Sequence, residues 1–239
     1  MEDGEARESQ RCEGVHAWME RELWPPYHPP PIAATAAGTS VARRKQTHDA
    51  IRRGRIVDMQ LGEWVAAVRA RRPYAPPAGK RVHAYTEKIQ RAFRTSWRWL
   101  PIHAQVGMSD RAWRLGTRAD LVVRSLRTRR LYLVEIKTAG AYGGAWDHDN
   151  GQRFLAPLED IKSCPLNHAL AQLTITLALA RRDRRHGLRF TDAYVVMVDD
   201  AHVQRYLLSK WEGFERLYKH VVHTLNVAAL RRARHGTDE

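Results

Sequence analysis

Several features that would place a chain in a familiar class are scarce or missing in these 239 residues. The two cysteines, Cys12 and Cys164, lie far apart and without C-x-x-C spacing, which excludes a disulfide framework and a cysteine zinc cluster. No run reaches the roughly 18 apolar residues of a membrane span, and the acidic N-terminus has no apolar signal segment. No G-x4-G-K-[ST] phosphate loop is present, so any ATPase would be another protein. We expect a soluble, intracellular protein of a reducing compartment with no membrane partner.

Acidic residues are also under-represented. Forty lysines and arginines stand against 26 aspartates and glutamates, which gives a formal net charge of +14. Such a balance favours a polyanionic partner, because each neutralised phosphate releases counterions. An arginine-rich coding bias would produce the same excess. Short basic clusters at 43–45 and 231–234 could assist nuclear entry, contact phosphate or simply remain solvated, so a nuclear or viral replication-site location stays open.

Composition divides the chain into four parts. Residues 1–40 predict a flexible, proline-rich arm, although their aromatic residues suggest that part of it docks on the body. Residues 41–78 predict a helical N-terminal subdomain, because their apolar residues fall at helical spacing. Residues 79–231 predict the core and 232–239 a tail. We expect an α/β fold with a central mixed β-sheet flanked by helices and an N-terminal helical arm. The expected core helices span 79–99, 166–181 and 209–230, and the expected strands span 102–106, 113–115, 121–123, 131–136, 193–198 and 203–208.

One pair of β-rich runs carries most of the functional signal. In the run 131–137 alternate side chains face opposite sides of a strand, so Glu135 and Lys137 share one face. The run 119–123 precedes it, and the polar segment between the two runs predicts a turn. The resulting hairpin would bring Asp120 beside Glu135.

Two carboxylates and a lysine suit phosphodiester hydrolysis. Mg²⁺ prefers oxygen ligands, which Asp120, Glu135 and the backbone carbonyl of Ile136 can supply, and Mn²⁺ is expected to substitute. A bound metal would lower the pKa of its water and stabilise charge on the phosphoryl oxygens. Lys137 would position that water or neutralise the developing oxyanion. The same three residues could also form a surface ion pair on an ordinary strand.

Further motifs surround this hairpin. Residues 79–87 read G-x3-H-x3-E, with His83 and Glu87 four apart on one face of the expected helix. Residues 116–120 read Gly-Thr-Arg-Ala-Asp, and the helix after the strands carries His168 and Gln172 one turn apart. With Glu135-Ile136-Lys137, these motifs resemble those of the PD-(D/E)XK nuclease superfamily, in particular its RecB-like and phage lambda exonuclease-like branch, which includes viral alkaline exonucleases. The resemblance covers residues 79 to about 180.

The resemblance implies a restriction-endonuclease-like core and a Mg²⁺-dependent deoxyribonuclease, more exonuclease-like than site-specific. It implies that His83 joins the metal shell and that Gln172 lies near the metal, where it contacts DNA or orients the site. The other residues implied to contact the substrate are Glu87, Arg118, Thr138 and His168. Two positions depart from the family pattern: Ala119 replaces the proline, and Thr176 stands where a tyrosine is common. Neither change removes a metal ligand.

The expected partner is DNA, as single strands or duplex ends, and RNA is not excluded. Two other functions fit the same residues. One is a structure-specific or nicking endonuclease of a virus or mobile element. The other is a catalytically inactive DNA-binding module that keeps the fold as a scaffold. Strand polarity and oligomeric state are not readable from the sequence.

Overall fold

The structure is a computed structural model that describes residues 13–24, 37–76, 79, 81–138, 146–147, 151–183, 185 and 187–235, without the side chains of 37–47 and 235. The parts of the predicted arm and tail that fall elsewhere lie outside the described residues, as does most of the chain between the expected strand 131–136 and residue 151. None of the described helices combines the length and apolarity needed to cross a membrane.

The centre of the fold is a mixed sheet of six strands. Strand β3 (Leu115–Ser125) pairs antiparallel with β2 (Trp99–Asp110) and with β4 (Leu131–Thr138), and parallel with the short β1 (Glu13–Gly14). Strand β5 (Phe190–Val198) lies parallel to β4, and β6 (Val203–Leu207) completes the edge antiparallel to β5. The predicted mixed sheet and its two hairpins are confirmed.

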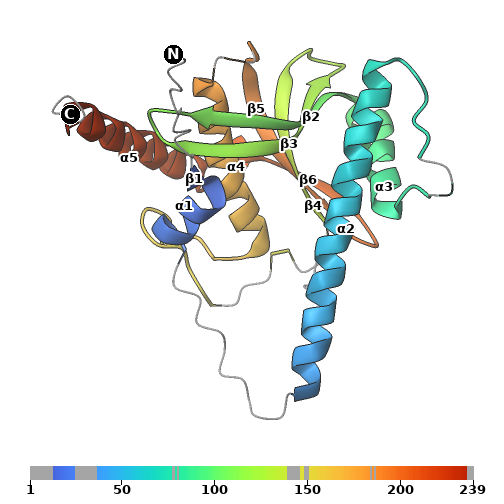
Figure 1. The fold of residues 1–239 in the computed structure, drawn as a ribbon, viewed down its shortest axis with the longest axis horizontal. Helices are drawn as coiled ribbons and strands as arrows, with labels where there is room; N and C mark the ends of the chain where they lie inside the picture. The colour runs from blue at the N-terminus through green and yellow to red at the C-terminus, as the bar shows by residue number, and fades with distance from the viewer. Residues whose placement is uncertain are drawn as a thin grey trace, which may run out of the picture.

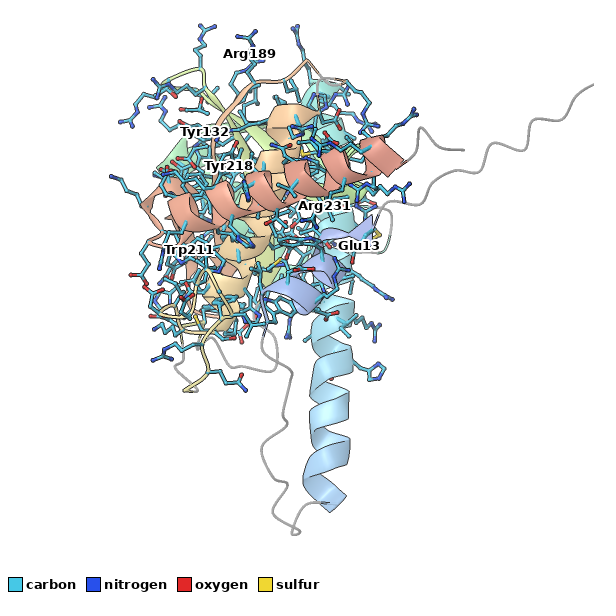
Figure 2. The ribbon with its side chains drawn as sticks, turned by 90° about the vertical axis from the view of Figure 1, so that its left-hand side faces the viewer. Glu13, Tyr132, Arg189, Trp211, Tyr218 and Arg231 are labelled. Atoms are coloured by element: carbon cyan, nitrogen blue, oxygen red, sulfur yellow. The ribbon has the colours of Figure 1, made fainter. Side chains whose placement is uncertain are left out.

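Helices cover both faces of this sheet (Figure 1). One face packs against α1 (Val15–Glu22), α4 (Pro165–Arg182) and α5 (Phe214–His235), and α5 crosses the outer side of α4 (Figure 2). The other face packs against α2 (Ala37–Arg69), α3 (Ala84–Ala92) and the π-helical turn Phe93–Trp97. A 3-10 turn, Leu208–Lys210, connects β6 to the segment before α5.

Helix α4 is the crossover between the parallel strands β4 and β5. Pro165 occupies its first turn, where a missing N–H costs nothing, and Arg181 and Arg182 lie at the negative end of the helix dipole. Its side chains are buried along most of its length, so the helix is held firmly against the sheet.

Two N-terminal expectations differ from the structure. Residues 13–24 form β1 and α1 rather than flexible chain. Val15, Trp18, Met19 and Leu23 are buried in the main core, in agreement with the expectation that part of the arm docks on the body. Of the segment 41–78 expected as a helical subdomain, residues 41–69 belong to a single 33-residue helix, α2, which contacts β2, β4 and α3. Figure 1 shows its N-terminal part extending beyond the body. The C-terminal half of α2 packs against the sheet, so this helix covers part of the core.

Candidate active site

The β3–β4 hairpin places the two predicted carboxylates side by side. Leu121 of β3 pairs with Val134 of β4, so Asp120 and Glu135 follow directly at the same level of the sheet. Oδ2 of Asp120 accepts a hydrogen bond of 2.8 Å from the backbone N–H of Ile136. The predicted proximity of Asp120 and Glu135 is therefore present.

Asp120 lies in an unfavourable place for a negative charge. Burial raises its pKa well above the ordinary value, and the adjacent charge of Glu135 raises it further. Its other oxygen, Oδ1, lies 3.5 Å from Nε2 of Gln105 on β2. Gln105 has a φ of 53°, a left-handed conformation that is uncommon for a residue with a side chain. The backbone of β2 is thus distorted opposite Asp120.

Lys137 links β4 to α4. Its Nζ lies 2.7 Å from Oε1 of Glu135 and 3.2 Å from Oε1 of Gln172. Burial by itself would lower the pKa of this lysine, but the charges of Glu135, Asp120 and Asp58 outweigh it and raise the pKa. The predicted grouping of Glu135, Lys137 and Gln172 is therefore present, with Lys137 fully charged between them.

Helix α2 adds a third carboxylate that the sequence did not reveal. Burial raises the pKa of Asp58, and the charge of Glu135 raises it further, while Lys137 and Arg118 act in the opposite direction. The helix comes close to the end of β4 at Gly54, where an added Cβ would lie 3.7 Å from Oγ1 of Thr138. Arg118 and Thr138, both predicted to contact substrate, thus lie at the rim of this cluster.

The carboxylate oxygens of Asp58, Asp120 and Glu135 are the type of ligand that a hard divalent cation prefers. Three carboxylates from α2, β3 and β4 interact with the half-buried ammonium of Lys137. Burial is the main cause of the raised pKa values of Asp58 and Asp120, and repulsion by the charge of Glu135 raises them further. A divalent cation would relieve that repulsion. As arranged, however, no three histidine, cysteine, aspartate or glutamate side chains among the described residues form a group able to hold a metal ion. The ammonium of Lys137 already neutralises Glu135.

His83 occupies a different role from the one implied. It is the N-cap of α3, and its Nδ1 accepts a hydrogen bond of 3.1 Å from the backbone N–H of Tyr85. Burial lowers its pKa, and the charges that act on it belong to Arg53 and Asp200, whereas Asp120 and Glu135 do not contribute. The structure therefore does not bring His83 together with the two carboxylates. Glu87, one turn later, is exposed.

His168 lies in a cleft that reaches the cluster. The cleft has a volume of about 360 Å³, and Lys137 and Gln172 line it together with His168. The structure thus places His168 within the same concavity as two of the predicted catalytic residues.

Ile136 contributes its backbone to the site. Its N–H donates to Asp120, and the role of the Ile136 carbonyl as a metal ligand stays a prediction.

Asp58 and Gln105 are the residues that sequence reasoning missed. Asp58 follows the buried Val57 in a helix otherwise rich in arginine, and a lone acid beside a core position is a weak signal. Gln105 has no local signal, because only the folded sheet shows that it faces Asp120.

Comparison with known proteins adds little. No protein-family model matches the chain, and no curated protein matches it. Among solved structures, one titled "Crystal structure of SSO0001" aligns at 15% identity with a TM-score of 0.28. The alignment covers 58% of this chain and 55% of that chain, so it spans about half the length of that protein. A similarity this low supports no inference about fold family or function.

Proposed function

We propose that this protein is a Mg²⁺-dependent deoxyribonuclease with a PD-(D/E)XK-like core, which hydrolyses phosphodiester bonds and acts preferentially at strand ends. The observation that carries the proposal is the convergence of Asp58, Asp120 and Glu135 on one charged lysine, Lys137, at the edge of a cleft. Structural ion pairs seldom gather three carboxylates around one ammonium, because the surplus negative charge destabilises the fold. Clustered carboxylates with perturbed pKa values are common in clefts that bind a cation or catalyse a reaction.

The roles follow from the positions of the side chains. Asp120 and Glu135, with Asp58 beside them, would hold the metal, which supplies an acidified water and neutralises charge on the phosphate. Lys137 would release Glu135 when the cation binds and turn its ammonium toward the attacking water or the phosphate. Gln172, whose Oε1 accepts from Lys137, would keep that ammonium in place. His83 has no part in this proposal.

A basic surface at the far end of the sheet supports a nucleic-acid partner. Exposed arginines gather around the β3–β4 turn and the start of β5, where Figure 2 shows Arg189 at the end of the molecule. None of their guanidinium groups forms an ion pair within the part of the chain that the structure describes; they are Arg98, Arg124, Arg127, Arg129, Arg130 and Arg189. Six residues of β4 separate this turn from Lys137, or about 20 Å of extended strand. A polyanion could therefore contact both regions at once.

The experiment that tests the proposal compares linear and covalently closed single-stranded DNA in Mg²⁺ or Mn²⁺. We expect the linear DNA to be degraded to short products and the circle to remain intact. Degradation of both would identify an endonuclease. An intact linear substrate, with RNA also intact, would contradict the proposed hydrolysis.

A second candidate is a nucleic-acid-binding module without catalysis. The observation that favours it is the 2.7 Å ion pair of Lys137 with Glu135, which neutralises a proposed metal ligand. This candidate predicts DNA binding that neither Mg²⁺ nor Asp120→Asn changes, and no cleavage of any strand.

A further inference from the structure

The cleft beside Lys137 is lined by several parts of the chain, which include His16 of α1 and Gln152 and Ser163 of the segment before α4. Strand β4 contributes Lys137, and the N-terminal half of α4 contributes His168 and Gln172. The segment after α1 contributes Trp24. That segment is fixed to the body, because the carbonyl of Leu23 accepts a backbone hydrogen bond of 2.9 Å from Leu155. The cleft therefore has an aromatic wall next to the proposed catalytic cluster.

The aromatic wall is a column of rings. The indole of Trp24 stacks on the imidazole of His168, with 4.5 Å between centroids and 19° between planes. Phe154 lies behind His168 at 5.0 Å, and the exposed His16 lies across Trp24 at 4.8 Å with its ring at 89°. His16 is exposed, and its Nδ1 lies 3.3 Å from Oε1 of Glu20 one turn later on α1. A base that stacks on this face of Trp24 would displace the His16 ring.

The orientation of His168 is set by a short hydrogen bond. Its Nε2 lies 2.6 Å from Oγ of Ser163. Burial lowers the pKa of His168 to about 4, so the imidazole is neutral at physiological pH. The imidazole that stacks on Trp24 is therefore uncharged, and Lys137 contributes a positive charge to the cleft.

Trp24 also has an unused donor. Its indole N–H is buried and has no acceptor among the described residues. A buried donor without a partner is costly, so this N–H gains free energy from an acceptor that water, an ion or a ligand supplies. The ring nitrogens and carbonyl oxygens of a nucleobase are acceptors of this kind.

We propose that this cleft binds one unpaired nucleotide of the substrate, with its base stacked on Trp24 and its phosphate directed toward Lys137 and Gln172. The inference deepens the proposed nuclease function and rests on it for the position of the scissile bond. A base can reach Trp24 only when it has left the duplex stack, so the preferred substrate is single-stranded DNA or a frayed end. A cleft of about 360 Å³ is at the small end of ligand pockets and accommodates a single nucleotide better than several.

Binding without cleavage tests this subsite. Fluorescently labelled hexathymidylate is titrated with the full-length protein in EDTA, beside hexamers that carry one abasic position moved along the strand. We expect wild-type protein to lose affinity roughly 5- to 100-fold at one abasic position, the usual range for one base–aromatic stack. Trp24→Leu should bind the intact hexamer more weakly than wild type does, by the same factor. Its affinity for the hexamer with that abasic position should equal the affinity of wild type for the same strand. Trp24→Phe should restore most of the affinity for the intact hexamer.

Trp211→Leu is the matched control. Trp211 is also half-buried with a buried, unpartnered indole N–H, but it does not line the cleft. Its substitution should change affinity less than twofold. Equal binding of intact and abasic strands by wild-type protein would overturn the proposal, even where Trp24→Leu fails to fold. So would equal losses for Trp24→Leu and Trp211→Leu.

The subsite and the nuclease can fail separately. If base-dependent binding through Trp24 is observed but the wild-type protein cleaves no nucleic acid in Mg²⁺ or Mn²⁺, the subsite stands and the proposed catalysis falls. If the protein cleaves DNA but Trp24→Leu binds and cleaves single strands like wild type, the subsite is wrong and the nuclease stands.

Discussion

The ammonium of Lys137 lies 2.7 Å from Oε1 of Glu135, inside a group that also contains the carboxylates of Asp120 and Asp58. One lysine cannot neutralise three acids. Burial raises the pKa values of Asp58 and Asp120, and the charge of Glu135 raises them further. A divalent cation would compensate the surplus negative charge. In this ion pair Lys137 supplies the positive charge next to Glu135.

Replacing Lys137 should separate metal binding from catalysis. Lys137→Met removes the competing ammonium, so we expect tighter Mn²⁺ binding, by several-fold, in a titration followed by electron paramagnetic resonance. Cleavage should fall by about 100-fold or more, since a positioned proton-transfer or charge-stabilising group contributes on that order. Lys210→Met, at an exposed lysine outside the cleft, is the control and should alter neither. Unchanged cleavage in Lys137→Met would remove the lysine from the mechanism.

Asp58 tests whether α2 belongs to the site. Asp58→Asn keeps the size of the side chain and removes its charge, so we expect weaker Mn²⁺ binding and at least about a tenfold fall in cleavage rate. Glu63→Gln lies on the same helix and can still accept the hydrogen bond from Tyr74, so it is a matched control. Equal rates for the two variants would show that Asp58 only packs near the site.

His83 should matter for stability more than for metal binding. His83→Ala removes the N-cap of α3, a change that costs about 1 kcal/mol and should lower the midpoint of chemical unfolding. His83→Asn supplies another good N-cap residue and should recover the loss. The cleavage rate per folded molecule should be the same in both variants. A loss of Mn²⁺ affinity that His83→Asn fails to recover would return His83 to the metal shell.

Fold and site were predictable to different degrees. The β3–β4 hairpin and the order of β5 and β6 follow from period-two patterns with polar turns between them, and local spacing alone determines that Glu135 and Lys137 share a face. His83 was expected within a helix, but α3 begins at Ala84 and His83 precedes it as the N-cap. At an N-cap position the side chain points toward the backbone N–H groups of the first turn of the same helix, here that of Tyr85.

Other features could not be read from local pattern. Asp58 joins Glu135 only through the packing of α2 on the sheet, across 77 residues of chain. The aromatic residues of the arm indicated that part of it docks, but the proline-rich composition of the surrounding segment masked the helical spacing of Val15, Trp18 and Met19 in α1. Tertiary burial, rather than propensity, decided both cases.

His168 gives the fold a predictable pH dependence. Its folded pKa of about 4 lies below the ordinary 6.5, so between these values the unfolded chain binds more protons. Stability should therefore rise with pH across this window, by at most about 1.4 kcal/mol per unit, and this contribution should be lost as pH falls. His168→Phe keeps the stack on Trp24 without a titrating group. The difference between wild type and His168→Phe in guanidinium unfolding at pH 5 and 7 measures the effect, and a difference that does not change with pH would contradict the buried, neutral imidazole.

The most direct test of the central claim is the cleavage of end-labelled single-stranded DNA by wild-type protein, Asp120→Asn and Glu135→Gln, each with EDTA, Mg²⁺ or Mn²⁺. Thermal unfolding of the same samples shows whether they are folded, and Asp120→Asn should be at least as stable as wild type because it removes a buried charge. We predict cleavage by wild type only with the divalent cation, and a loss of at least about 100-fold in both variants. Cleavage in EDTA, or folded variants that cut as fast as wild type, would contradict a metal-dependent site at Asp120 and Glu135.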